Sequence, residues 1–144
     1  VTSEDIQFAS AVFNEFLRIR SGSPLFRLTT GEDVGDRVGF HNIGQRQTQG
    51  LVVMSIDDGT GLTDLDPAVD AIVVVVNGSA SEQTADVNTA AGFELHSIQQ
   101  TSIDEVVRSK IMKSLTARIR GTEDRPVIFQ TRGRFLKNRS MGTS

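Results

Sequence analysis

The sequence contains no cysteine, tryptophan or tyrosine among its 144 residues. Without cysteine, the chain has no disulfide, no thiolate nucleophile and no cysteine-ligated zinc site. Its longest unbroken apolar runs, such as residues 71–76, are far shorter than the roughly 20 residues that cross a bilayer. The first residues show no secretory signal pattern. Apolar residues make up 38% and charged residues 23%. This composition predicts one globular domain and argues against a disordered or fibrous chain.

Basic and acidic residues are distributed unevenly along the chain. Residues 1–107 hold five basic and sixteen acidic residues, a net charge of −11, whereas residues 108–144 hold ten basic and two acidic ones, a net charge of +8. So abrupt a change indicates a boundary between segments of different role or origin. The basic segment contains a cluster that could bind nucleic acid or an anionic membrane surface: Arg132, Arg134, Lys137 and Arg139. A solvated or disordered tail, or a translation artefact, is the favoured interpretation.

Residues 3–20 have the pattern of an amphipathic helix. Thr2 or Ser3 can cap it, and acidic residues follow in the first turn. Gly22 and Pro24 end it. Its apolar residues recur at helical spacing in one wide stripe: Ala9, Val12, Phe13, Phe16 and Leu17. We expect a large neighbouring domain to cover this stripe.

After Pro24 the pattern changes to short strands separated by turn residues. Strands are predicted at residues 38–41, 51–56, 71–76 and 93–98, with a polar turn at 44–50 and an Asp- and Gly-rich loop at 57–70. Strands at this spacing predict an antiparallel β-sandwich, and thus a mainly β fold preceded by a helix.

The chain beyond residue 107 has mixed signals. Ser102 and Glu105 have the spacing of a capping box. Apolar residues then recur every four positions, which predicts a basic amphipathic helix: Val107, Ile111, Leu115 and Ile119. A short strand is also expected at residues 127–129, after Pro126.

Several strings of residues occur together in a familiar order. They are FLRIR at 16–20, SPLFRL at 23–28, RVGFHN at 37–42, VMSIDDG at 53–59, DLDP at 64–67 and IVVVVN at 72–77. As a set, covering roughly residues 8–107, they resemble the C-terminal region of pullulanase-type alpha-1,6-glucosidases, starch-debranching enzymes of the alpha-amylase superfamily. The resemblance implies a parent glycoside hydrolase that cleaves alpha-1,6 linkages in pullulan, amylopectin and limit dextrins.

The resemblance also implies a division of the chain. Residues 1–28 correspond to the final helix and junction of a catalytic (β/α) barrel, and residues 29–107 to the C-terminal β-sandwich domain. Residues 108–144 are a divergent basic tail in place of the family's closing strands. A frameshifted, chimeric or disordered ending explains the tail, and a genuine divergent ending is the alternative. The family's catalytic carboxylates belong to the barrel, so no catalytic, cofactor-binding or metal-binding residue is assigned to this chain.

Two groups of polar residues have a functional and a structural interpretation. A calcium site is one reading of the aspartates of the 57–70 loop, and turn chemistry is the favoured one: Asp57, Asp58, Asp64, Asp66 and Asp70. His41 and His96 are expected to be structural, hydrogen-bonded at the ends of strands. A glycosidase pair among the acidic residues is disfavoured, because surface loops of a sandwich rarely build the required cleft.

The favoured hypothesis is a structural accessory domain whose partner is the catalytic barrel of the same polypeptide. Alpha-glucan would be reached through the parent enzyme, with no nucleic acid partner, no membrane span and no cofactor. The alternatives are a glucan-binding module, disfavoured by the missing tryptophan and tyrosine, and an unrelated β-sandwich interaction domain. An extracellular or cell-surface location is implied by resemblance alone.

Overall fold

The computed structural model describes residues 1–59, 61–87, 93–108, 118–121 and 125–132. A five-stranded antiparallel sheet in the order β1-β2-β3-β7-β5 forms its centre, and β4 and β6 form a second, two-stranded sheet. The strands are β1 Val38–Phe40, β2 Leu51–Asp57, β3 Val69–Asn77, β4 Gln83–Asp86, β5 Glu94–Leu95, β6 Arg118–Gly121 and β7 Arg125–Arg132. The helices are α1 Ser3–Gly22, η1 Pro24–Arg27, α2 Gly31–Arg37, α3 Ser97–Gln100 and α4 Glu105–Arg108.

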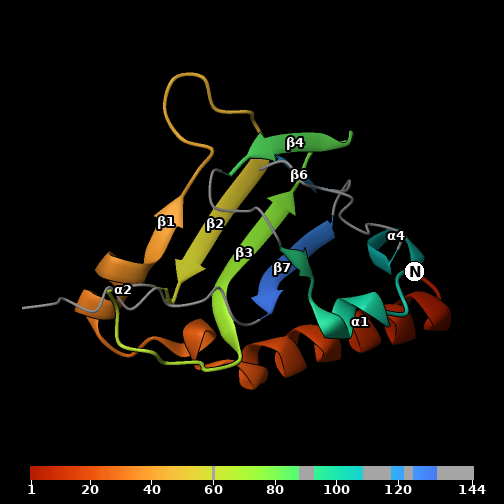
Figure 1. Ribbon diagram of the computed structural model, residues 1–144. Coiled ribbons are helices and arrows are strands. Elements are labelled where there is room, and N and C mark those ends of the chain that lie inside the picture. Colours follow the sequence, from red (N-terminus) through yellow and green to blue (C-terminus); the bar gives the residue numbers. More distant parts are fainter. Residues whose placement is uncertain (60, 88–92, 109–117, 122–124, 133–144) are drawn as a thin grey trace, which may run out of the picture.

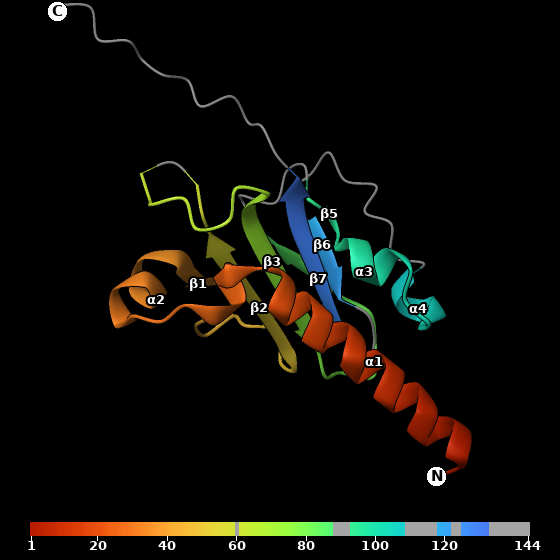
Figure 2. The same cartoon turned by 90° about the horizontal axis from the view of Figure 1, so that it is seen from below.

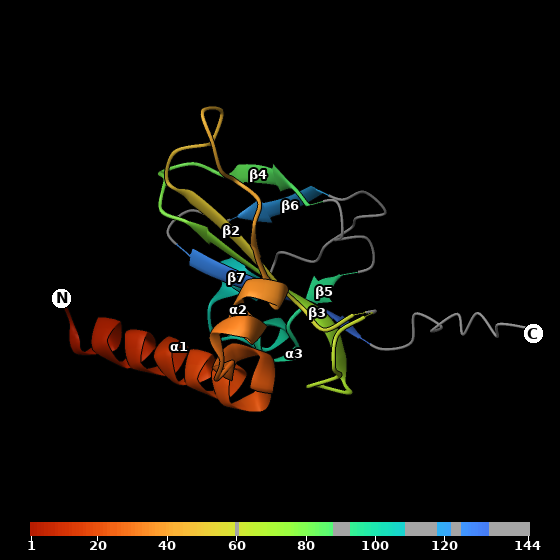
Figure 3. The same ribbon diagram turned by 90° about the vertical axis from the view of Figure 1, so that its left-hand side faces the viewer.

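The elements form layers on either side of the large sheet (Figure 1). Helix α1 runs diagonally across one face (Figure 2), and the β4–β6 pair lies over the opposite face (Figure 3). The predicted mainly β, antiparallel fold with a leading helix is confirmed. In the described part of the chain, the second layer of the sandwich is the β4–β6 pair.

Helix α1 begins with a capping box at Thr2. The Thr2 hydroxyl accepts a hydrogen bond from the N–H of Asp5 at 3.2 Å, and the Asp5 carboxylate accepts one from the N–H of Thr2 at 2.7 Å. This reciprocal pair satisfies N–H groups that have no partner within the helix. The helix ends before Pro24, where Ser23 caps the short helix η1. Both ends therefore lie where the sequence predicts.

Alternating side chains on β2 and β3 build a core on each face of the sheet. One cluster lies on the face away from α1 and consists of Leu51, Val53, Val73, Val75, Val87, Phe93 and Leu95. The other joins the sheet to α1 and η1 and consists of Ile19, Leu25, Ile56, Val69, Ile72 and Ile128. Because both faces are covered at the centre, β3 is apolar on both sides, as its valine-rich sequence indicates.

The helix predicted through the basic tail is wrong where the tail is described. Residues 118–121 are β6 and residues 125–132 are β7, which confirms the strand expected at 127–129. The physical reason is that β6, which contains Ile119 of the expected helix, pairs with β4, so sheet hydrogen bonding overrides the local helical period. Among the described residues the helix is limited to α4, and residues 109–117 and 133–144 lie outside the described part.

Two local predictions near α4 also need correction. Ser102 does not cap this helix, because the Asp104 carboxylate accepts the hydrogen bond from the N–H of Val106, at 3.0 Å. The Ser102 hydroxyl instead accepts one from the N–H of Asp104, also at 3.0 Å. The strand expected at 93–98 is limited to β5, because the His96 ring caps α3 by accepting a hydrogen bond from the N–H of Ile98.

Candidate functional site

Helix α1 carries apolar side chains on two faces. Toward the sheet, Ile19 is 1% exposed and Phe16 packs against the same core. On the adjacent, solvent-facing side Ile6 and Phe13 are each 62% exposed and Leu17 is 46% exposed. We call these last three residues the outward face of α1. A surface helix with one partner needs one apolar stripe, so a second stripe indicates a second partner.

The structure divides the single stripe that the sequence predicts. Val12 and Phe16 are half-buried against the domain, whereas Ala9, Phe13 and Leu17 are exposed. Sequence reasoning missed Ile6, although its helical spacing from Phe13 places it on the same side.

The junction after α1 is fixed to the sheet domain. Ser23 is buried, and its hydroxyl donates a hydrogen bond to the Asp66 carboxylate at 2.5 Å. The same hydroxyl accepts a hydrogen bond from the N–H of Leu25 at 3.2 Å, and Leu25 is 1% exposed in the core. These contacts hold the end of α1 against the 57–70 loop, so the outward face is presented at a defined orientation.

A buried ion pair joins α2 to the same loop. The guanidinium of Arg37 contacts the carboxylate of Asp58 and donates a hydrogen bond to the carbonyl of Thr63 at 2.6 Å. The Asp58 carboxylate also accepts hydrogen bonds from the N–H groups of Leu65 at 2.9 Å and Asp66 at 2.7 Å. Buried charges are tolerated when they are paired and hydrogen-bonded in this way. The ion pair therefore has a structural role, because it fixes α2 to the 57–70 loop.

Two aspartates in the first turns of helices, the exposed Asp5 and the half-buried Asp33, have lowered pKa values. Hydrogen bonds from Thr2 lower the pKa of Asp5. The Thr30 hydroxyl and then the Arg37 guanidinium lower the pKa of Asp33. Hydrogen bonds to a carboxylate favour its charged form, and both residues cap helices.

Two of the aspartates considered as a calcium site make turn contacts, and Asp58 pairs with Arg37. Asp57 accepts a hydrogen bond from the N–H of Gly59 at 2.9 Å, and Asp66 accepts one from the N–H of Ala68 at 3.1 Å. Within the residues that the structure describes, no group of three or more His, Asp or Glu side chains could hold a metal ion.

The two histidines lie in separate places and make structural hydrogen bonds. The Nε2 atom of His41, just after β1, lies 2.8 Å from the hydroxyl oxygen of Ser55 on β2. His96, just after β5, caps α3. Both are therefore hydrogen-bonded at strand ends, as the sequence predicts.

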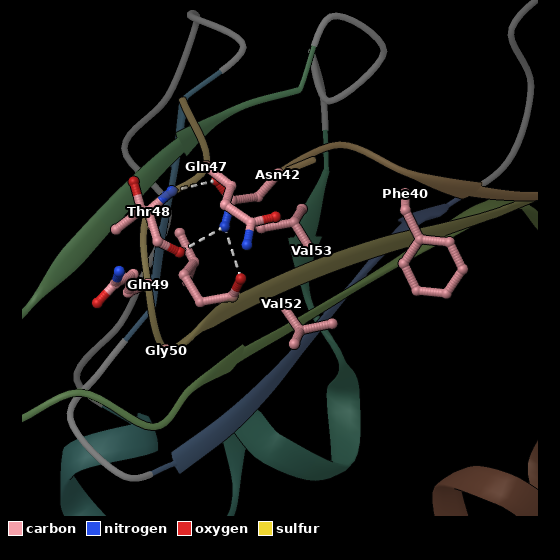
Figure 4. A pocket seen from close by; sticks show the side chains of 9 residues that line it. Phe40, Asn42, Gln47, Thr48, Gln49, Gly50, Val52 and Val53 are labelled. Carbon is pink, nitrogen blue, oxygen red and sulfur yellow. Dashed lines mark hydrogen bonds between the residues drawn. The ribbon is translucent and has the colours of Figure 1, made fainter. Parts of the chain in front are cut away.

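A shallow cavity of about 410 Å³ lies beside the 42–51 loop (Figure 4). Asn42 fixes this loop, because its amide nitrogen donates to the carbonyls of Thr48 at 2.8 Å and Leu51 at 2.6 Å. Its amide oxygen accepts from the N–H of Thr48 at 2.8 Å. The lining carries no charged residue: Phe40, Asn42, Gln47, Thr48, Gln49, Gly50, Leu51, Val52 and Val53. The cavity therefore offers no carboxylate pair for glycoside hydrolysis.

Two expectations concern membranes and polyanions. Over the described ranges, no helix has the length and apolar character needed to cross a membrane. Of the basic cluster in the tail, Arg132 ends β7, whereas Arg134, Lys137 and Arg139 lie outside the described residues.

Comparisons with known proteins agree on one family. Residues 1–121 match the family model for the C-terminal region of pullulanase-type alpha-1,6-glucosidases. The chloroplastic pullulanase 1 of Arabidopsis thaliana is 38% identical over 110 residues, which are 72% of this chain and 11% of that protein. The pullulanase of Klebsiella pneumoniae is 35% identical over 99 residues, which are 68% of this chain and 9% of that protein.

A solved structure extends the agreement to the fold. The crystal structure of apo pullulanase from Klebsiella pneumoniae superposes with a TM-score of 0.81 at 29% identity, covering 92% of this chain and 14% of that one. The chain thus spans about a tenth of the length of the curated relatives it matches. Because the family model covers residues 1–121, the chain belongs to the family of C-terminal domains of pullulanase-type alpha-1,6-glucosidases.

Proposed function

We propose that the chain is a non-catalytic, structural region of a pullulanase-type enzyme and packs against the catalytic barrel of the same polypeptide. The observation that carries this proposal is the outward face of α1, where Ile6, Phe13 and Leu17 are exposed on a helix whose other face is already buried. In this arrangement α1 belongs to both bodies: residues 1–28 end the barrel, and the accessory domain begins at residue 29 and includes β7, which pairs with β3.

The mechanism is stabilisation by burial. Fully burying a large apolar side chain contributes about 1.5–3 kcal/mol, and the side chains of the outward face are about half exposed before contact. Burial of all three side chains by the barrel would therefore stabilise the contact by roughly a few kcal/mol and hold the end of the barrel in place. The rigid Ser23–Asp66 junction transmits that support, because it fixes α1 to the sheet. The barrel supplies the carboxylates for hydrolysis of alpha-1,6 linkages in pullulan, amylopectin and limit dextrins.

Support for the non-catalytic role comes from the chemistry of the described surface. Hydrolysis of a glycosidic bond requires two carboxylates across a sugar cleft. Of the aspartates of the 57–70 loop, Asp57 and Asp66 accept hydrogen bonds in turns, and Asp58 pairs with Arg37. The residues that line the cavity beside Phe40 carry no charge. The purified chain should therefore release no reducing sugar from pullulan, and measurable turnover would contradict the assignment.

The packing role is tested in the full-length polypeptide that carries this region. The double substitution Phe13→Ser and Leu17→Ser should lower the temperature of thermal inactivation by several degrees, while the activity per folded molecule at low temperature changes little. Val34→Ser on α2 is the matched control, because Val34 is 46% exposed, like Leu17, but lies off the outward face. Equal inactivation temperatures for all variants would contradict the packing role.

A further inference from the structure

The sequence contains a single Asn-Gly dipeptide, formed by Asn77 and Gly78. It lies where β3 ends and the chain turns toward β4 (Figure 1). Asparagine is a thermolabile residue, and it deamidates fastest when glycine follows, because glycine has no side chain to hinder the attack of its own backbone nitrogen. The other asparagines of the chain all precede larger residues. The end of β3 is therefore the most reactive asparagine of the sequence.

Deamidation of this dipeptide needs no catalyst and no oxidant. The backbone nitrogen of Gly78 attacks the side-chain carbonyl carbon of Asn77, so that a new C–N bond forms and the bond to Nδ2 breaks. The attacking nitrogen gives up its proton, and the side-chain nitrogen leaves as ammonia. Water then opens the resulting five-membered imide to aspartate or isoaspartate. One water is consumed and one ammonia is released in total.

The folded chain holds every group that this reaction must move. Asn77 is 0% exposed, and its amide nitrogen donates a hydrogen bond to the carbonyl of Ser81 at 2.7 Å. Its amide oxygen accepts hydrogen bonds from the N–H of Ser79 at 3.0 Å and from the hydroxyl of Ser79 at 2.7 Å. The N–H of Gly78, the attacking group, donates to the carbonyl of Gly50 at 2.7 Å. Attack would break these bonds inside the protein, so the native fold protects the dipeptide.

The products of deamidation do not fit this position. An aspartate places a carboxylate oxygen where the amide nitrogen now donates to the carbonyl of Ser81, so two acceptors would face each other. Burying such an unpaired charge is costly. Isoaspartate also adds a carbon to the backbone of a strand that is paired on both sides, since Asn77 lies opposite Leu51 and Arg125. Either product therefore opposes refolding.

We propose that Asn77–Gly78 is a deamidation site that the fold protects and that unfolding exposes, and that its conversion makes unfolding irreversible. A stable domain is unfolded in a fraction of roughly 10⁻³ or less of its molecules, so conversion is slow in the native chain. Heating raises this fraction, and each converted molecule is lost to refolding. The lifetime of the chain at high temperature is then limited by chemistry at the end of β3.

Peptide mass spectrometry tests the protection on the chain kept folded in buffer and on the chain unfolded in urea, at one temperature and one mildly alkaline pH. Conversion of Asn77 should be at least about a hundred-fold slower in the folded chain, because only the small unfolded fraction reacts. Asn14, exposed on α1 and followed by Glu15, is the internal control and should convert slowly in both. Equal rates of conversion of Asn77 in the two conditions would overturn the inference.

Gly78→Ala separates the chemistry from the fold. A Cβ at this position would meet the carbonyl oxygen of Gly50 at 3.7 Å, an ordinary contact, so the folded chain accepts it. In urea the added methyl group should slow the conversion of Asn77 several-fold. The fraction of chain that refolds after long incubation in urea should rise accordingly. Gly35→Ala is the matched control, because its Cβ meets nothing within 4 Å and it follows Val34, and it should leave both quantities unchanged.

Refolding supplies the second readout. In the natural chain the refolded fraction should fall with the same time course as the conversion of Asn77. The variant Asn77→Asp, made directly, should unfold at a lower urea concentration than the natural chain or fail to refold. Complete refolding of converted chain would overturn the inference. An equal loss of refolding in the natural chain and in Gly78→Ala, despite slower conversion in the variant, would also overturn it.

Discussion

The side-chain oxygen of Gln99 accepts a hydrogen bond from the backbone N–H of Ile128 at 2.7 Å, across 29 residues of sequence. The carbonyl of Ile128 accepts another from the N–H of His96 at 2.9 Å. Strand β5 ends at Leu95, so α3 uses a side chain to continue the pairing along β7. Gln99 thereby covers part of a strand edge that would otherwise be open.

Replacing Gln99 by leucine should destabilise the chain by about 1–3 kcal/mol, because the N–H of Ile128 loses this acceptor inside the protein. Gln99 is 2% exposed, so water cannot easily take its place. The free energy of unfolding, measured by urea denaturation of the chain, checks this. Gln45→Leu, in an exposed turn, is the control and should change the value by less than about 0.5 kcal/mol. Equal unfolding energies for the two variants would contradict the proposed role of this bond.

The sequence predicted those elements whose signal is local. Helix α1 follows from the helical spacing of its apolar residues, and strands β2 and β3 follow from their apolar, largely β-branched runs. Strand β7 was predicted only as residues 127–129, because its partners are distant: Val127 pairs with Val75, and this contact is invisible to a local window. The four-residue recurrence from Val107 is compatible with a helix, but its last member, Ile119, pairs with Ala85 between β6 and β4.

The surface proposed to bind the barrel was predictable only in part. Periodicity identified Phe13 and Leu17 but not that they face away from the domain, because a stripe in sequence does not say which partner covers which part of it. The contact of Ser23 with Asp66, which holds the end of α1 against the 57–70 loop, joins segments far apart in the sequence and is invisible to a local window.

Substitution of Arg37 by methionine should cost about 3–5 kcal/mol, because it leaves the Asp58 carboxylate buried without its cationic partner. This is a large part of the total stability of a typical domain. The midpoint of urea denaturation should fall accordingly. Arg27→Met is the control, because Arg27 is exposed and makes one hydrogen bond, at 3.4 Å to the carbonyl of Ser21. If the urea midpoint of Arg37→Met equalled that of the control, the ion pair would not stabilise the contact between α2 and the loop.

The free energy of unfolding of the chain should depend on pH through the protonation of Asp33. Its pKa is lowered first by the Thr30 hydroxyl and then by Arg37, so it lies below the unfolded value of about 3.9. Between the two pKa values the unfolded chain binds more protons than the folded chain, and the free energy of unfolding rises with pH. The contribution is fully present above the unfolded pKa and is lost as the pH falls through the folded pKa.

A mutant cycle measured by urea denaturation from pH 2.5 to 7 isolates this effect. The difference in unfolding free energy between the natural chain and Asp33→Asn should be constant above about pH 5 and should shrink as the pH falls below about 4. In the natural background, where Asp33 is present, the unfolding free energy lost through Thr30→Val should show the same pH dependence. The reason is that this substitution removes the larger cause of the lowered pKa of Asp33. In the Asp33→Asn background the cost of Thr30→Val should lose this dependence and keep only the part due to the helix cap. A cost that varies equally with pH in both backgrounds would place the titrating group elsewhere than at Asp33.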